Sequence, residues 1–301
     1  MGNVPEWASF ADEEQYTAFM AAVENYLIDH GISYTLEGGF VNAEEDYFGS
    51  PRLGLQNMLQ YCVQNPVETY MDMVKNQFDT TRENHLFNEE FKKIEDDFEK
   101  VKEYIGVRIY DSGYMANISG DAVLAREISE NLFAMLIFDQ PYSVSNIPPA
   151  KLEKWNKTAD ELFEFGIHNM RDHYPVPINE QDFEGFRIWY ASVGHFFVPN
   201  IIFDLKDRPE LLGSKGALIG IPHRHAVIIY PIEDAEVLQA INVLLPTVYN
   251  MCVQGPGSIS SSLYWYHDGE LTELPCGVQD QSLAFYPPEN FIQFIQTLDK
   301  S

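Results

Sequence analysis

Apolar side chains recur every three or four positions in several segments of the chain, which is the period of an amphipathic helix. One such segment follows Ser9 and ends at Gly31, a residue type that often terminates helices. The most regular segment runs from Phe87 to Ile105, with charged residues between its apolar positions. Because it spans fewer than three heptads, we expect a single helix that packs on its own domain rather than a coiled coil.

Other segments indicate strands. Residues 32–42 alternate between apolar and polar before a Gly-Gly pair, which predicts a β-hairpin. After residue 105, strand-like and helical segments alternate along the chain. Thr158 and Glu161 have the spacing of a capping box, and Pro246 should kink or split its helix. We expect strands within residues 107–115, 132–144, 186–194, 216–222, 226–232 and 258–271, and helices within 53–65, 67–78, 119–129, 158–170, 234–253 and 288–298.

This order of elements predicts an α+β fold, in which a helical N-terminal region precedes a mixed or antiparallel sheet with packed helices. We expect residues 1–105 to form the mainly helical region with its short hairpin. Residues 106–182 should form a first α+β module, and residues 183–301 a second one with a C-terminal helix. The segments VRIYDSG and FRIWYASVG each lead to a strand pair and a long helix, which a duplication would also produce.

The net charge of the chain indicates which classes of macromolecule can bind it. Its 301 residues include 46 Asp and Glu but only 19 Lys and Arg, so the formal net charge is −27. Such a surface repels phosphate backbones, and we therefore expect no nucleic-acid partner. It favours solubility and a basic protein as partner.

The N-terminal residues contain neither a basic start nor an apolar run, so we expect no signal peptide and a cytoplasmic protein without membrane contact. Three cysteines without metal-ligand spacing predict neither a disulfide framework nor a zinc site. The phosphate-loop, nucleophile-elbow and dinucleotide-binding motifs are absent from the sequence. We therefore expect no cofactor, and the motif search favours a binding protein over an enzyme.

The stretch IGIPHRHAVIIYPI is the main candidate for chemistry. His223 and His225 are two residues apart, and residues i and i+2 of a strand point to one face, where two imidazoles can share a metal. Further ligands would come from a set of Asp and His residues elsewhere in the chain: Asp204, Asp234, His195 and His267. Alternatively, the three residues His-Arg-His form a hairpin loop between two strands. The loop interpretation is favoured, and its imidazoles should then face water and titrate near 6.5.

A partner could also be contacted here. The turn residues His223, Arg224 and His225 are candidate contacts, and so is Trp265, which lies on an alternating strand with an aromatic neighbour at each side.

The chain also resembles a known family. The segment ENLFAMLIFDQPYSVSNIPPAKLEKWNKTADELFEFGIHNMR resembles a passage of the YtpQ-like bacterial proteins, a domain-of-unknown-function family. The later segment from GALIGIP to GELTEL is similar to that family's closing hairpin, helix and hairpin, including the pair Pro222 and His223. Family members tend to carry an acid where this chain has His225. The resemblance implies an α+β fold and no established chemistry.

Two functions follow as hypotheses. The first is an intracellular, non-enzymatic binding or regulatory protein with an acidic surface, with a basic protein as its partner. The alternative is a metal-dependent or hydrolase-like enzyme that uses the region around His223 and His225.

Overall fold

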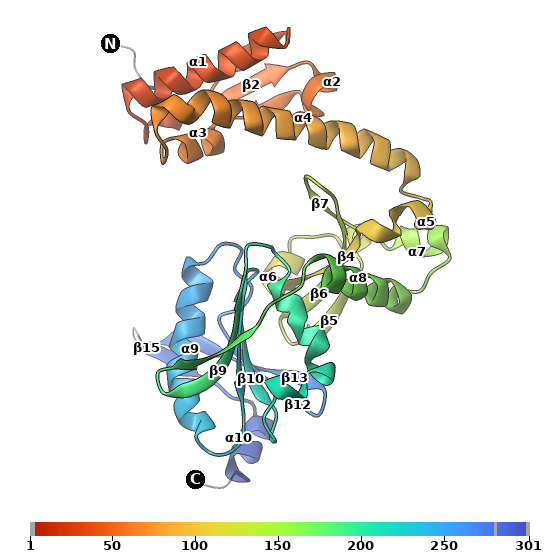
Figure 1. The fold of residues 1–301 in the computed structure, drawn as a ribbon, viewed down its shortest axis with the longest axis vertical. Coiled ribbons are helices and arrows are strands. Elements are labelled where there is room, and N and C mark those ends of the chain that lie inside the picture. The colour runs from red at the N-terminus through yellow and green to blue at the C-terminus, as the bar shows by residue number, and fades with distance from the viewer. Residues whose placement is uncertain (1–3, 280–281, 299–301) are drawn as a thin grey trace. The chain divides into compact units, whose positions relative to one another are not determined.

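A computed structural model describes residues 4–279 and 282–298. The chain divides into two compact units, of which the first comprises Met1–Asp96 with Gln140–Ser143 and the second Asp97–Asp139 with Val144–Ser301 (Figure 1). Helices and sheets occur in both units, and every pairing between the described strands is antiparallel. The α+β class and the helical N-terminal region are therefore confirmed.

The N-terminal unit is a pair of packed helices beside a small sheet. Its long helices are α1 (Glu13–Asp29) and α4 (Tyr70–Ile94), which pack against each other. The predicted hairpin is present as β1 (Tyr34–Glu37) and β2 (Phe40–Ala43), and a third strand, β3 (Arg52–Gly54), pairs with β2. The short elements are η1 (Glu6–Ala8), α2 (Glu45–Phe48), α3 (Gln56–Cys62) and η2 (Val67–Thr69).

The ends of α1 follow from local chemistry. Asp12 accepts a hydrogen bond from the backbone N–H of Gln15, whose side chain in turn accepts one from the Asp12 N–H. The helix therefore begins at Glu13, four residues after Ser9. Gly31 has a φ of 65°, the left-handed conformation expected after a helix C-terminus. The predicted end is confirmed.

The predicted helix from Phe87 to Ile105 is wrong at both ends. Its first part continues α4, which joins it to the preceding segment in one helix of 25 residues that ends at Ile94. Phe98 begins a separate short helix, α5 (Phe98–Val101), and Ile105 begins a strand. Asp96 and Asp97 lie at this break, and aspartate disfavours helix interiors because its side chain competes for backbone hydrogen bonds.

The second unit contains a four-stranded sheet next to α8 (Ala159–His173). Its strands are β4 (Ile105–Asp111), β6 (Leu132–Asp139), β5 (Ala125–Ser129) and β7 (Val144–Asn146), with β6 paired to each of the others. The predicted capping box of Thr158 and Glu161 begins α8. The helix expected within residues 119–129 is wrong, because this segment forms the short turn η4 (Gly120–Ala122) and then β5.

The same unit contains a six-stranded sheet in the order β13-β12-β10-β11-β9-β8. Its strands are β8 (Asn179–Phe183), β9 (Phe186–Ser192), β10 (Ala217–His223), β11 (Ala226–Pro231), β12 (Leu263–His267) and β13 (Glu270–Leu274). The remaining elements of the unit are η3 (Lys102–Tyr104), α6 (Ser112–Met115), α7 (Ala150–Trp155), η5 (Val198–Asp207), η6 (Pro209–Leu211), α9 (Val237–Gln254), β14 (Cys276–Gln279), β15 (Ser282–Phe285) and α10 (Glu289–Gln296).

Both faces of the six-stranded sheet are covered. Ile229 packs on one face with residues of η5, and Ile228 packs on the other face with residues of α9 and α10. Both side chains are buried. The two side chains alternate between the faces, but neither face is open to solvent, and β10 and β11 are apolar on both sides for this reason. The helix α9 runs through Pro246 without being split.

The two expected modules do not form separate bodies. Ile109 of β4 and Leu132 of β6 belong to the same hydrophobic cluster as residues of the six-stranded sheet, so residues 97–139 and 144–301 form one unit. The first boundary lies after residue 96 rather than 105. The strand β8 crosses the expected boundary at 182 and pairs with β9. Among the described residues, no helix combines the length and the apolar composition needed to cross a bilayer.

Candidate functional site

The His-Arg-His stretch is a tight turn, as the sequence predicted. Strand β10 ends at His223 and β11 begins at Ala226, and these two residues are partners in the strand register. The Arg224 N–H donates to the carbonyl of Gly257, so a neighbouring segment holds the turn from one side. The Val193 N–H donates to the His225 carbonyl from the other side.

The histidines of this turn are not freely solvated. All three turn residues are half-buried, and the His223 ring packs so closely on Gly255 that a Cβ at that glycine would lie 2.2 Å from the ring. Burial lowers the pKa of His223, and the nearby His225 lowers it further. The expectation that both imidazoles face water and titrate near 6.5 is therefore wrong for His223, because neighbouring chain segments cover the turn.

Hydrogen bonds orient both rings. The Nδ1 atom of His223 accepts from the backbone N–H of His225 at 3.3 Å, so the neutral ring carries its proton on Nε2. The Nδ1 atom of His225 lies 3.3 Å from the Val193 carbonyl and donates to it. The His225 ring also meets the ring of Phe196 edge-on at 5.1 Å between centroids.

The structure does not assemble a metal centre around the two histidines. Their ring centroids are 6.2 Å apart, and no group of three His, Cys, Asp or Glu residues in residues 4–279 and 282–298 could hold a metal ion. Of the expected further ligands, Asp204 pairs with Arg171, whereas Asp234 accepts a backbone hydrogen bond at the start of α9.

The other two expected ligands are also in place for different reasons. His267 stacks on Trp265, 4.9 Å between ring centroids, and lies 3.3 Å from Asp268. His195 is near the turn: its pKa is lowered by burial and, to a lesser extent, by His225. Its Nδ1 accepts from the Phe197 N–H, and its Nε2 lies 3.4 Å from the Pro175 carbonyl, so both ring nitrogens already have partners other than a metal shared with His223.

What does gather at the turn is a cationic and aromatic group, which we term the Phe196 cluster: Arg108, Tyr110, Phe196, Arg224 and His225. The guanidinium carbon of Arg224 lies 4.3 Å from the centre of the Phe196 ring, and that of Arg108 lies 5.7 Å from it. Arg108 also lies over the ring of Tyr110 at 5.0 Å. The Phe196 side chain is 41% exposed. Sequence reasoning found Arg224 and His225 but missed the other three residues.

The two arginines differ from others in the same unit. Arg126, Arg171, Arg187 and Arg208 each form an ion pair with a carboxylate. In contrast, neither Arg108 nor Arg224 forms an ion pair or a side-chain hydrogen bond with any residue that the structure describes, and the Arg224 Nε is buried without a partner. In a chain with 46 acidic residues, neither guanidinium group has a carboxylate within ion-pair distance in the described part of the chain. Burial raises the pKa of Asp139, but its carboxyl group is close enough to Arg108 for the positive charge to offset part of that rise.

Trp265 is not a surface contact. Its side chain is 7% exposed and lies between β12 and α10, where its ring centroid is 5.2 Å from that of Phe291 and 4.5 Å from that of Phe294. The proposal of a partner contact at this residue is corrected, because α10 covers the face of the sheet that the alternation pattern leaves open.

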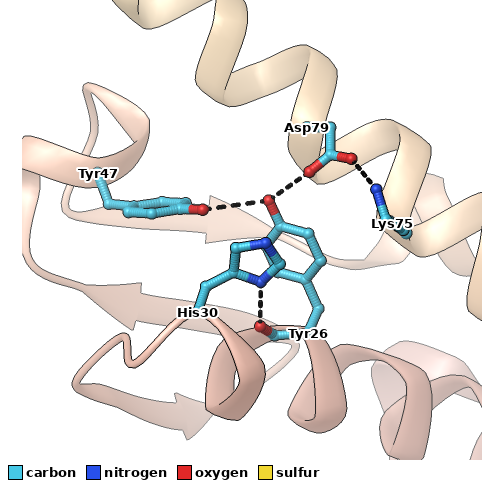
Figure 2. A network of polar contacts seen from close by, with 5 residues as sticks. All are labelled: Tyr26, His30, Tyr47, Lys75 and Asp79. Atoms are coloured by element: carbon cyan, nitrogen blue, oxygen red, sulfur yellow. Dashed lines mark hydrogen bonds and ion pairs between the residues drawn. The ribbon is translucent and has the colours of Figure 1, made fainter.

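A second polar group lies in the N-terminal unit (Figure 2). The Tyr26 hydroxyl donates to Asp79 Oδ1 at 2.8 Å, and Lys75 pairs with Asp79 Oδ2 at 2.5 Å. Tyr47 lies 3.3 Å from the same hydroxyl, and the His30 ring stacks on Tyr26 at 4.0 Å. The hydrogen bonds from Lys75 and Tyr26 lower the pKa of Asp79. This group joins α1, α2 and α4 through hydrogen bonds and ring contacts among its own members, which is the arrangement of a structural contact.

No family model, no curated protein and no solved structure matches the chain. The resemblance to the YtpQ-like proteins stays a prediction.

Proposed function

We propose that the protein is a non-enzymatic binding protein, and that the Phe196 cluster is its main contact with a protein partner. The observation that carries this proposal is an exposed phenylalanine ring with two arginines on it that have no carboxylate partner. Arginine and aromatic residues dominate the energetically important positions of protein interfaces. Tyr114, which is 40% exposed and stacks on Tyr110 at 4.1 Å, extends this surface.

The surrounding charge supports a basic partner. A net charge of −27 attracts a positively charged protein over a distance of about one Debye length, roughly 8–10 Å. Within that acidic surface, the two arginines form a small positively charged site. This site would determine how the partner is oriented, because complementary charges give specificity. The partner would then place an acidic or carbonyl group against Arg224.

The cytoplasm is the proposed location. All three cysteines are free, and burial raises the pKa of Cys62 to about 11, so this thiol is protonated and unreactive at neutral pH. Three free thiols, of which Cys62 is buried, fit a reducing compartment.

Co-purification tests the proposal. Tagged protein would be incubated with native lysate at low salt, and retained proteins identified for the wild type and for the double variant Arg108→Gln/Arg224→Gln. Arg187→Gln is the matched control, since it removes one positive charge from a paired, exposed arginine in the same unit. A partner retained by wild type and control, and lost from the double variant, supports the proposal. Equal retention by the double variant, or reproducible absence of any retained protein, contradicts it.

A further inference from the structure

We infer that the Phe196 cluster is an oxyanion site, which takes a phosphate or carboxylate group held between Arg108 and Arg224. This inference deepens the proposed function and rests on the same site, but it names the chemical group that is recognised. The hydrogen-bond donors of Arg108, Arg224 and His223 support it, rather than the exposure of the aromatic rings.

The guanidinium groups of Arg108 and Arg224 contact the same aromatic side chain. Both lie on the Phe196 ring, so their carbon atoms are within about 10 Å of each other. Two positive charges at this separation repel each other, and in the described part of the chain no carboxylate lies within ion-pair distance of either. An oxyanion removes that repulsion and satisfies planar N–H donors that match its oxygens in geometry.

Arg224 is held against Gly257. Its side chain crosses Gly257 so closely that a Cβ there would lie 2.6 Å from Cδ and from Nε. The φ of this glycine is 70°, a conformation that side chains disfavour. The Nε–H is buried and has no acceptor among the described residues, which is costly for a polar group. The two Nη groups also lack an acceptor there but are not buried, so they are the donors open to a ligand.

His223 supplies a further hydrogen-bond donor. Because His223 accepts a backbone hydrogen bond at Nδ1, its Nε2–H is a donor, and no side chain or carbonyl of the described residues accepts it. The turn therefore carries a neutral donor in addition to the positive donors of Arg224. A metal site needs lone pairs, whereas this group offers N–H bonds, so the chemistry of the cluster selects an anion over a cation.

The exposed Phe196 ring suggests that the oxyanion is attached to a flat group, since aromatic pairs prefer offset or edge contacts with a ring of the ligand. Phenyl phosphate and benzoate are therefore suitable probes. They share one ring and differ in the oxyanion, and benzamide has the same ring without a charge.

Calorimetric titration of the full-length protein at low ionic strength tests the inference. We expect saturable binding of phenyl phosphate, benzoate or both to the wild type and to Arg187→Gln, and no binding of benzamide. The stronger of the two ligands distinguishes a phosphate source from a carboxylate source. Arg224→Gln should weaken binding at least tenfold, and Arg224→Lys should restore only part of it, because a lysine ammonium is a point charge without the planar fork.

Arg108→Gln, on β4 rather than in the turn, is a second variant in case Arg224→Gln does not fold, and it should also weaken binding. Failure of both oxyanions to bind, equal binding of benzamide, or affinities unchanged in both variants would overturn the inference. If the oxyanions fail while a lysate partner is still lost from the double variant, the proposed function stands and the ligand class is wrong. If the oxyanions bind while no partner is retained, the ligand class stands and the protein-partner function is wrong.

Discussion

Gly220 in β10 offers a sharp test of how closely α9 packs on the sheet that carries the turn. A Cβ at this position would lie 2.4 Å from Cγ2 of Val248, whose side chain is fully buried. Ordinary carbon contacts are about 3.5–4.0 Å, so the added methyl group overlaps by more than about 1 Å. The clash is with the rigid side chain of a β-branched residue in a helix, which cannot rotate away freely.

We expect Gly220→Ala to lower the free energy of unfolding by about 1–3 kcal/mol, the usual cost of overpacking. Val248→Ala removes two buried carbons, worth about 0.8 kcal/mol each before the cavity term is added, or roughly 2–3 kcal/mol in total. In the double variant the new methyl group occupies the space that Val248 leaves. The two losses should therefore not add, and the double variant should be more stable than their sum by at least about 1 kcal/mol.

Urea denaturation followed by circular dichroism measures all three variants. Gly120→Ala is the matched control, because a Cβ there meets no atom within 4 Å, and its effect should stay within about 0.5 kcal/mol. Strictly additive losses, or a Gly220→Ala variant as stable as the wild type, would refute the packing described for β10 and α9.

Three further outcomes are expected. In urea denaturation, Ile228→Ala and Ile229→Ala should each lower the free energy of unfolding by roughly 2–5 kcal/mol. The control Val253→Ala, at a side chain 67% exposed, should lower it by less than about 0.5 kcal/mol. A mild effect at either isoleucine would contradict the coverage of both faces of the sheet. Because burial lowers the pKa of His223, the unfolded state binds its proton more tightly than the folded state does. The free energy of unfolding should therefore fall as the pH decreases through about 6.5, and His223→Asn should reduce that fall. An NMR titration midpoint of His223 at or above about 6.5 would contradict this prediction. The melting temperature should rise between low and moderate sodium chloride, since screening weakens repulsion within a net charge of −27, and a falling value in calorimetry contradicts this.

Elements with a strong local signal were predictable from the sequence. The capping box before α8 and the Gly-Gly hairpin of β1 and β2 each depend on residues within a few positions of one another. The His-Arg-His turn was predictable for the same reason, because two apolar strands leave only three residues between them. In these places local preference and the final fold agree.

Elements whose state depends on distant contacts were not predictable. The segment that forms β5 has a helix-like composition, but it becomes a strand because β6 offers it an edge. The burial of Ile228 and Ile229 depends on η5, α9 and α10, and alternation cannot show that both faces of a sheet are covered. Likewise, the regular stripe from Phe87 to Ile105 continues across the boundary between two units, and periodicity alone does not reveal where a helix ends.

The candidate site illustrates the same limit. Arg108 lies on β4, Phe196 lies between β9 and η5, and Arg224 lies in the turn after β10, so three separate segments meet at one ring. None of these residues belongs to a motif, and their significance appears only when each arginine is compared with the paired arginines of the same unit. A sequence shows how many charges a chain carries, but it does not show which of them lack a counterion.

The position of the cluster on the fold also favours recognition. The turn connects β10 and β11, the strands whose side chains are most completely buried on both faces, so its backbone is held by core packing rather than by the turn itself. A side chain fixed in this way loses little conformational freedom when it binds, and less of the interaction energy is spent on ordering it. Arg224, which is held between Gly257 and Phe196, is therefore already in place for an anion. The rigid scaffold and the unpaired charge are independent features of the structure, and both favour a binding site at the same residue.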